Sequence, residues 1–91
     1  MAVTVFIPSP LRQFTGGQFA VQAEGRTVAD VLAGVTASHP DLRANLLKNP
    51  GQLQPFVHLF VGGRDIAGQQ GLATAVPDGG ELLIVQAISG G

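Results

Sequence analysis

Alternating apolar and polar residues predict two strands near the beginning of the chain. Residues 3–7 place valine and isoleucine side chains on one face and Phe6 on the other, which is the period of a strand. Residues 18–23 alternate in the same way, with Phe19 among the positions of the apolar face, and residues 12–17 predict a short connecting loop. The order of strand, loop and strand predicts an antiparallel hairpin.

Residues 27–38 change to a helical period. Apolar side chains recur at intervals of three and four residues and form one face, made of Val28, Val31, Leu32 and Val35. Thr27 is a favourable N-cap residue, and Asp30 three positions later resembles the partner in a capping box. We expect the helix to end at His39, because the residue before a proline avoids the helical conformation.

The second half of the chain predicts two more long strands, residues 56–61 and 81–87. Gly62-Gly63 closes the first of them and leads into a short return strand over residues 64–66. The sequence Pro-Asp-Gly-Gly at 77–80 is a strong turn signal immediately before the second strand.

Between the helix and these strands, residues 41–48 predict a short helical turn with leucines facing inward, and residues 49–51 predict a loop. The fold class is therefore α+β, in which one helix covers one face of the sheet. This order matches the β-grasp (ubiquitin-like) architecture, a mixed sheet of four to five strands packed on one main helix. No repeat or linker divides the chain, so residues 1–87 are expected to form the domain and residues 88–91 a flexible C-terminal diglycine tail.

The last strand carries apolar residues at positions of both faces. If alternate residues face the helix, then Leu83 and Val85 point to solvent, and the strand at 56–61 leaves Phe60 outside beside His58. An exposed apolar group of this size usually marks a binding site for a partner, so these four residues are the candidate partner-binding residues. The alternative is a strand buried on both faces, covered by residues 41–55.

Composition describes a single globular domain and excludes several classes of partner. The chain has 91 residues, 45% of them hydrophobic and 12% charged, with a formal net charge of −1 and no cysteine. Its five basic residues are scattered, so no nucleic acid partner is expected. No apolar run approaches the roughly 18 residues that span a bilayer, and no targeting signal is visible, so no membrane partner and a cytoplasmic location are expected.

No arrangement of side chains predicts catalysis or metal binding. The only histidines, His39 and His58, belong to different predicted elements and have no carboxylate at ligand spacing. No serine lies on a nucleophile elbow, and the paired glycines form no phosphate-binding motif. We therefore expect no catalytic residue, no metal site and no bound cofactor.

The chain ends in Gly90-Gly91, directly downstream of the apolar strand candidate. Glycine has no Cβ atom, so a tail ending in two glycines can pass through a narrow channel in an extended conformation. A folded domain that presents such a tail offers its terminal carboxylate to another protein.

Together these segments resemble the MoaD/ThiS family of ubiquitin-like sulfur carriers along nearly the whole chain. The segments that carry the resemblance are residues 3–8, 15–17, 27–32 with His39-Pro40, 56–61 and 77–81, in register with the diglycine end. Within the family, the length, the loop at 15–17, an insertion at 50–56 and residues 71–75 are most similar to the CysO-type carriers of actinobacterial cysteine biosynthesis.

The resemblance implies a protein that is a co-substrate and not an enzyme. An E1-like adenylating enzyme of the MoeB/ThiF type would thread Ile88, Ser89 and Gly90 into its active site and use ATP to adenylate the Gly91 carboxylate. A sulfur donor would then convert Gly91 to a thiocarboxylate, which a sulfur-accepting enzyme, such as a cysteine synthase or a pterin synthase large subunit, would consume.

Other interpretations of the fold and the diglycine end stay open. Cysteine synthesis is the preferred destination of the sulfur; the alternatives are molybdopterin synthesis, with this chain as the small synthase subunit, and the thiazole of thiamine. A second functional class is a ubiquitin-like modifier that is joined to lysines through Gly91. A third class is a plain interaction module whose terminal glycines have no function.

Overall fold

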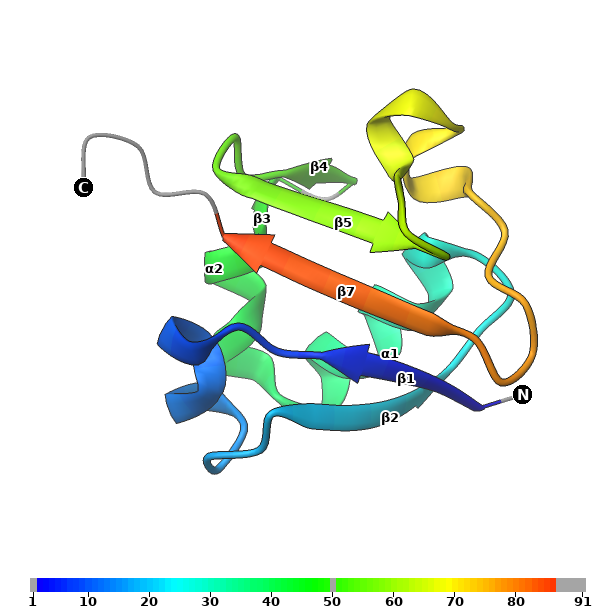
Figure 1. Cartoon of the computed structure of the whole chain (residues 1–91). Coiled ribbons are helices and arrows are strands. Elements are labelled where there is room, and N and C mark those ends of the chain that lie inside the picture. The colour runs from blue at the N-terminus through cyan, green and yellow to red at the C-terminus, as the bar shows by residue number, and fades with distance from the viewer. Residues whose placement is uncertain (1, 50, 87–91) are drawn as a thin grey trace.

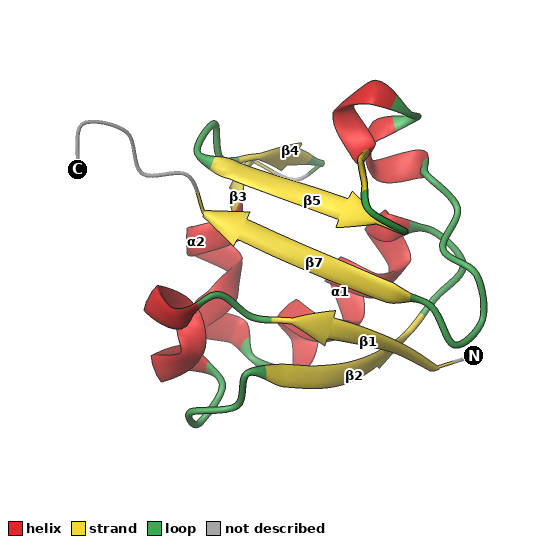
Figure 2. Ribbon diagram, in the orientation of Figure 1, coloured by secondary structure: helices red, strands yellow, loops and turns green. Residues whose placement is uncertain are grey.

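The computed structural model describes residues 2–49 and 51–86. A five-stranded mixed sheet forms one layer, and α1 (Val28–Ser38) packs across one of its faces (Figure 1, Figure 2). The strand order is β2-β1-β7-β5-β6. The strands are β1 (Ala2–Phe6), β2 (Ala20–Glu24), β5 (Val57–Val61), β6 (Arg64–Asp65) and β7 (Glu81–Gln86). The predicted α+β class, with a mixed sheet on one main helix, is confirmed.

The pairing of the strands puts the last strand in the middle of the sheet. β1 and β2 form the predicted antiparallel hairpin, and β7 pairs in parallel with β1 and antiparallel with β5. Gly62 and Gly63 connect β5 to β6 with φ angles of 58° and 80°. Two successive positive φ angles are the requirement of a type I′ hairpin turn, so this turn depends on glycine.

The helix begins and ends where the sequence predicts. The hydroxyl of Thr27 accepts a hydrogen bond from the backbone N–H of Asp30 at 3.3 Å, which satisfies one of the free donors of the first turn. The Asp30 carboxylate in turn accepts from the backbone N–H of Arg26 at 3.4 Å. His39 is the C-cap, and Pro40 begins the next element. Local sequence therefore determines both ends of α1.

The core lies between α1 and the inner face of the sheet. It contains the four apolar residues of the helical face together with alternate residues of the strands, among them Val3, Val5, Leu59, Leu82 and Ile84. Leu42 and Leu46 complete it from the short helices η2 (Pro40–Leu42) and α2 (Arg43–Leu46). The segment at residues 41–46 thus packs into the core, as predicted for its helical turn.

The helical turn predicted for residues 41–48 ends at Leu46, and the segment after it is not the loop that was predicted for residues 49–51. Two short strands, β3 (Leu47–Asn49) and β4 (Gln52–Leu53), form a separate antiparallel hairpin. Gly51 has a φ of 78°, and the side-chain amide of Asn49 donates to Gln52 Oε1 at 3.1 Å. The turn residues that predicted a loop instead connect these two short strands.

The N-terminal connection also differs from prediction. Residues Ser9–Phe14 form the 3-10 helix η1, whose Leu11 is buried. The buried Thr15 hydroxyl then bonds the carbonyl oxygens of Arg12 and Gln18, so β2 starts only at Ala20. Phe19 therefore lies outside the strand and is 63% exposed, and its predicted place on the apolar face was wrong.

The remaining helical turns, η3 (Ile66–Gly68) and η4 (Gly71–Ala73), lie between β6 and β7. Across residues 2–49 and 51–86, none of the helices has the length and apolar character needed to cross a bilayer.

Candidate functional site

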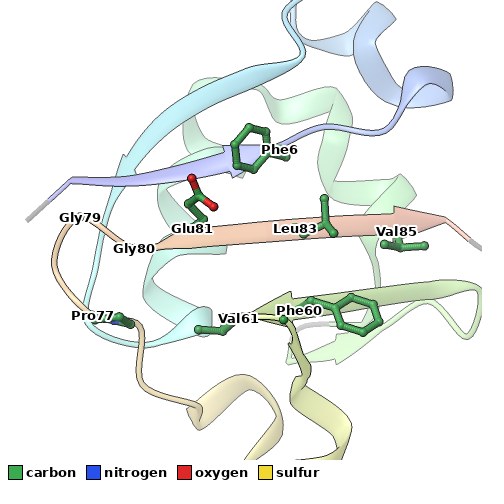
Figure 3. Close-up of a pocket in the computed structure, with 11 residues that line it drawn as sticks. Phe6, Phe60, Val61, Pro77, Gly79, Gly80, Glu81, Leu83 and Val85 are labelled. Atoms are coloured by element: carbon green, nitrogen blue, oxygen red, sulfur yellow. The ribbon is translucent and has the colours of Figure 1, made fainter.

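Three large apolar side chains form a row across the outer face of the sheet, the face away from α1. Leu83 of β7 lies in register with Phe6 of β1 on one side and with Phe60 of β5 on the other. Leu83 is 45% exposed, whereas its chain neighbour Leu82 is completely buried. Figure 3 shows the three side chains on adjacent strands of this face. The alternative that β7 is covered on both faces was wrong.

Val85 and His58 form the next row, toward the C-terminal end of β7. They lie opposite each other in the β5–β7 register. His58 Nδ1 lies 3.8 Å from Asp65 Oδ2 at the edge of the sheet, and both side chains are partly exposed. The four residues proposed from the sequence, including Phe60 and Leu83, thus lie together on two neighbouring strands. Their role in binding a partner stays a prediction.

Phe6 lies on the same face but was not among the residues predicted from the sequence. Its place on the face opposite Val3 and Val5 was visible in the alternation, but the parallel pairing of β1 with β7 was not. We call Phe6, Phe60, Leu83 and Val85 the outer patch.

A depression of about 960 Å³ runs along the outer patch and continues beyond it. Its continuation lies at the end of the sheet where β7 begins, between the β5–β6 turn and the turn before β7 (Figure 3). We call this part the distal groove; its residues are Val61, Gly62, Gly63, Pro77, Gly79, Gly80 and Glu81.

The turn at Pro77–Gly80 holds one wall of the distal groove in place. Gly79 has a φ of 74°, and the N–H of Gly80 donates to the carbonyl of Pro77 at 2.9 Å. A Cβ atom on Gly80 would lie 2.7 Å from that carbonyl oxygen. Backbone hydrogen bonds from Gly79 to Ala2 and from Thr4 to Gly80, both 3.0 Å, tie the turn to β1. The start of β7 is therefore anchored, and only glycine fits the turn without rearrangement.

The other end of β7 leads toward the predicted reactive terminus. Gln86, its last residue, lies opposite Val57 of β5. The predicted threading residues Ile88, Ser89 and Gly90, the predicted thiocarboxylate residue Gly91 and the domain boundary after residue 87 lie outside the described residues. Among the residues that are described, no three His, Cys, Asp or Glu side chains gather as metal ligands.

Comparison with known proteins assigns the chain to a family. The sequence pattern of the ThiS family matches residues 5–91. The chain belongs to the ThiS family. It is 40% identical to the sulfur carrier protein CysO of Mycobacterium tuberculosis over 93 residues, an alignment that covers both chains completely. The resemblance to the CysO-type carriers, inferred from sequence segments, is confirmed.

Solved structures give the same assignment for the fold of this ThiS-family chain. The crystal structure of the Amycolatopsis orientalis BexX/CysO complex matches with a TM-score of 0.90 and 38% identity, over 98% of this chain and 99% of that one. The solution structure of the small archaeal modifier protein SAMP1 from Methanosarcina acetivorans matches with a TM-score of 0.87 and 26% identity, over 99% of this chain and 96% of that one. The ubiquitin-like β-grasp architecture is confirmed.

Proposed function

We propose that this CysO-like chain carries sulfur on its terminal carboxylate, at Gly91. In this proposal an E1-like adenylating enzyme binds the outer patch and receives the tail, residues 88–91. The protein contributes no catalytic group of its own, and the partner supplies the ATP-binding site.

The chemistry follows from the poor reactivity of a carboxylate. An oxygen of the Gly91 carboxylate attacks the α-phosphate of ATP, and pyrophosphate leaves. A sulfide-level donor then attacks the carbonyl carbon of the acyl-adenylate, and AMP leaves with the original carboxylate oxygen. The product is a thiocarboxylate, whose sulfur is more nucleophilic than the oxygen it replaces. The acceptor is a cysteine-synthesising enzyme in the preferred version of the proposal.

The observation that carries the proposal is that one strand, β7, both contributes to the docking surface and leads to the terminal carboxylate. β7 presents Leu83 and Val85 on the exposed sheet face, and six residues later the chain reaches Gly91. Six extended residues span at most about 20 Å, so an enzyme that covers the outer patch has the terminal carboxylate within reach of its active site. The complex of a 38% identical CysO with BexX supports the use of a partner protein.

A modifier role is the second candidate, because SAMP1 is similar along almost the whole chain. Conjugation would start from the same acyl-adenylate, but a lysine amine of a target protein would become joined to Gly91. Molybdopterin and thiazole synthesis differ from the preferred proposal only in the acceptor of the sulfur.

Intact-mass spectrometry separates these functions. The full chain is incubated with the adenylating enzyme of its own genome, ATP and sulfide. We expect the mass change of one oxygen replaced by sulfur, and none in a variant that lacks Gly91 or carries one added residue after it. A protein adduct at Gly91 would identify a modifier. An unchanged mass with an enzyme that adenylates a CysO-type carrier would disprove the proposed function.

A further inference from the structure

The distal groove combines apolar walls with one carboxylate. Val61 and Pro77 supply the apolar side chains, and the glycines between and beside them leave the backbone bare. This part of the depression therefore has apolar side chains on its walls and no side chains on the glycine backbone beside them. Its single charged lining residue is Glu81, which is exposed.

Figure 3 shows how the Glu81 side chain lies. It leans from β7 toward β1, on the sheet face that also carries Phe6; its register partner on β1 is Thr4, two positions before Phe6. A carboxylate and an aromatic ring on the same face suit a planar cation. Such a cation can pair with the carboxylate and stack on the ring.

Nothing within the described part of the chain neutralises Glu81. No lysine or arginine lines the depression. The neighbouring side chains of the same row are already engaged with each other, because Gln22 Nε2 donates to Thr4 Oγ1 at 3.0 Å. A partner that covers this face with apolar surface alone would desolvate the carboxylate without replacing its lost hydrogen bonds, which is costly.

We propose that the distal groove is the anchor site for an arginine of the docking protein. The guanidinium pairs with Glu81 and stacks on Phe6, while the aliphatic stem lies along Val61 and Pro77. Lysine fits less well, because its ammonium is a compact, strongly hydrated charge that makes no planar stack. The proposal rests on the proposed function in one respect only, namely that a protein docks on the outer patch.

A fragment titration tests the site without any partner. Butylguanidinium is added to the full-length ¹⁵N-labelled chain, with butylammonium and butyramide as matched probes. We expect saturable shifts of the amide signals of Gly62, Gly63 and Gly80 with butylguanidinium, weaker ones with butylammonium and none with butyramide. The substitution Glu81→Gln should abolish them, whereas Asp78→Asn, which removes the same charge from the adjacent turn, should not. Equal shifts in both variants, or no shifts in the parent, would overturn the proposal.

Kinetics with the adenylating enzyme test whether the site is used in docking. Glu81→Gln should raise KM for the carrier about three- to tenfold and leave kcat unchanged, because a charge pair at the rim acts on binding and not on chemistry. Glu81→Asp should restore part of the loss, and Asp78→Asn should leave KM unchanged. Equal effects of Glu81→Gln and Asp78→Asn would mean general electrostatic attraction and reject the anchor.

Failure of the proposed function and failure of the arginine site can be distinguished. If the chain is not adenylated by any enzyme, the proposed function fails, and the fragment titration still decides the arginine site. If the signals of the distal groove shift on simple dilution of the chain, a second copy covers this face, and the anchor for a different protein is rejected.

Discussion

Leu83 of β7 faces Phe60 of β5 across an antiparallel pair, on the sheet face opposite α1. The contact leaves Leu83 45% exposed at the centre of an apolar patch. A large apolar side chain that is partly exposed to solvent contributes less to the folding free energy than a buried one. Its presence is therefore better explained by binding than by stability.

The adjacent residues Leu82 and Leu83 permit a matched test of that statement. Leu83→Ala should lower the free energy of unfolding by about 1 kcal/mol or less, because much of the side chain is already in water. Leu82→Ala should cost about 2–5 kcal/mol, because it leaves a cavity in the core. Denaturant unfolding measures both values.

Binding should show the reverse order for the two variants under conditions where both are folded. Leu83→Ala, and likewise Phe60→Ala, should weaken binding to the adenylating enzyme, whereas Leu82→Ala should not. A loss of stability in Leu83→Ala as large as that in Leu82→Ala would mean that Leu83 belongs to the core.

Gly80→Ala should destabilise the protein by roughly 1–3 kcal/mol. The new methyl group would meet the carbonyl oxygen of Pro77 at 2.7 Å, so the turn before β7 must shift. Gly68→Ala is the control, because open space surrounds that position and its backbone is not left-handed. There alanine should leave stability unchanged or raise it by about 0.5 kcal/mol. Thermal unfolding of the two variants gives the comparison, and a neutral Gly80→Ala would contradict the anchored turn.

Thr27→Ala should lower stability by about 1 kcal/mol, since the hydroxyl caps α1 through the N–H of Asp30. For a domain of this size that corresponds to a fall in Tm of roughly 4–8 °C. Thr36 lies within the same helix, and its hydroxyl bonds back to the carbonyl of Leu32 at 2.8 Å. Thr36→Ala should therefore be neutral or stabilising, because alanine has the higher helix propensity. A Tm that falls equally in both variants would argue against the cap.

Asp65 has two contacts that substitution can separate. Its Oδ1 accepts from the N–H of Ala67 at 2.9 Å and caps η3, while its Oδ2 lies near His58. Asp65→Asn keeps the cap and should change stability by less than about 0.5 kcal/mol, because a contact between two partly exposed polar side chains contributes little. Asp65→Ala removes the cap and should cost about 1 kcal/mol. Similar losses in both variants, measured by urea unfolding, would assign the stabilisation to the contact with His58.

Local patterns predicted the elements whose causes are local. The period of α1, its cap at Thr27 and its end before Pro40 all depend on residues within one or two turns of each other. Alternation within β7 likewise predicted that Leu82 and Leu83 point to opposite faces. These features need no knowledge of the neighbouring element, because backbone geometry alone imposes them.

Other features depended on contacts between distant segments. Phe19 continues the alternation of β2 but lies outside the strand, because Thr15 closes the preceding loop with two hydrogen bonds. The hairpin of β3 and β4 was hidden, because each strand is too short to show a period.

The sequence by itself determined the family, the helix, the long strands of the main sheet and the exposed face of β7, since each has a short-range pattern or a specific motif. Only the tertiary structure decided which strands lie on either side of β7. The parallel pairing of β1 with β7 places Phe6 beside Leu83, and the turn at Pro77–Gly80 brings Glu81 to the end of the same groove. Strand pairing is chosen by the packing of the whole core, and no local pattern along the chain contains that choice.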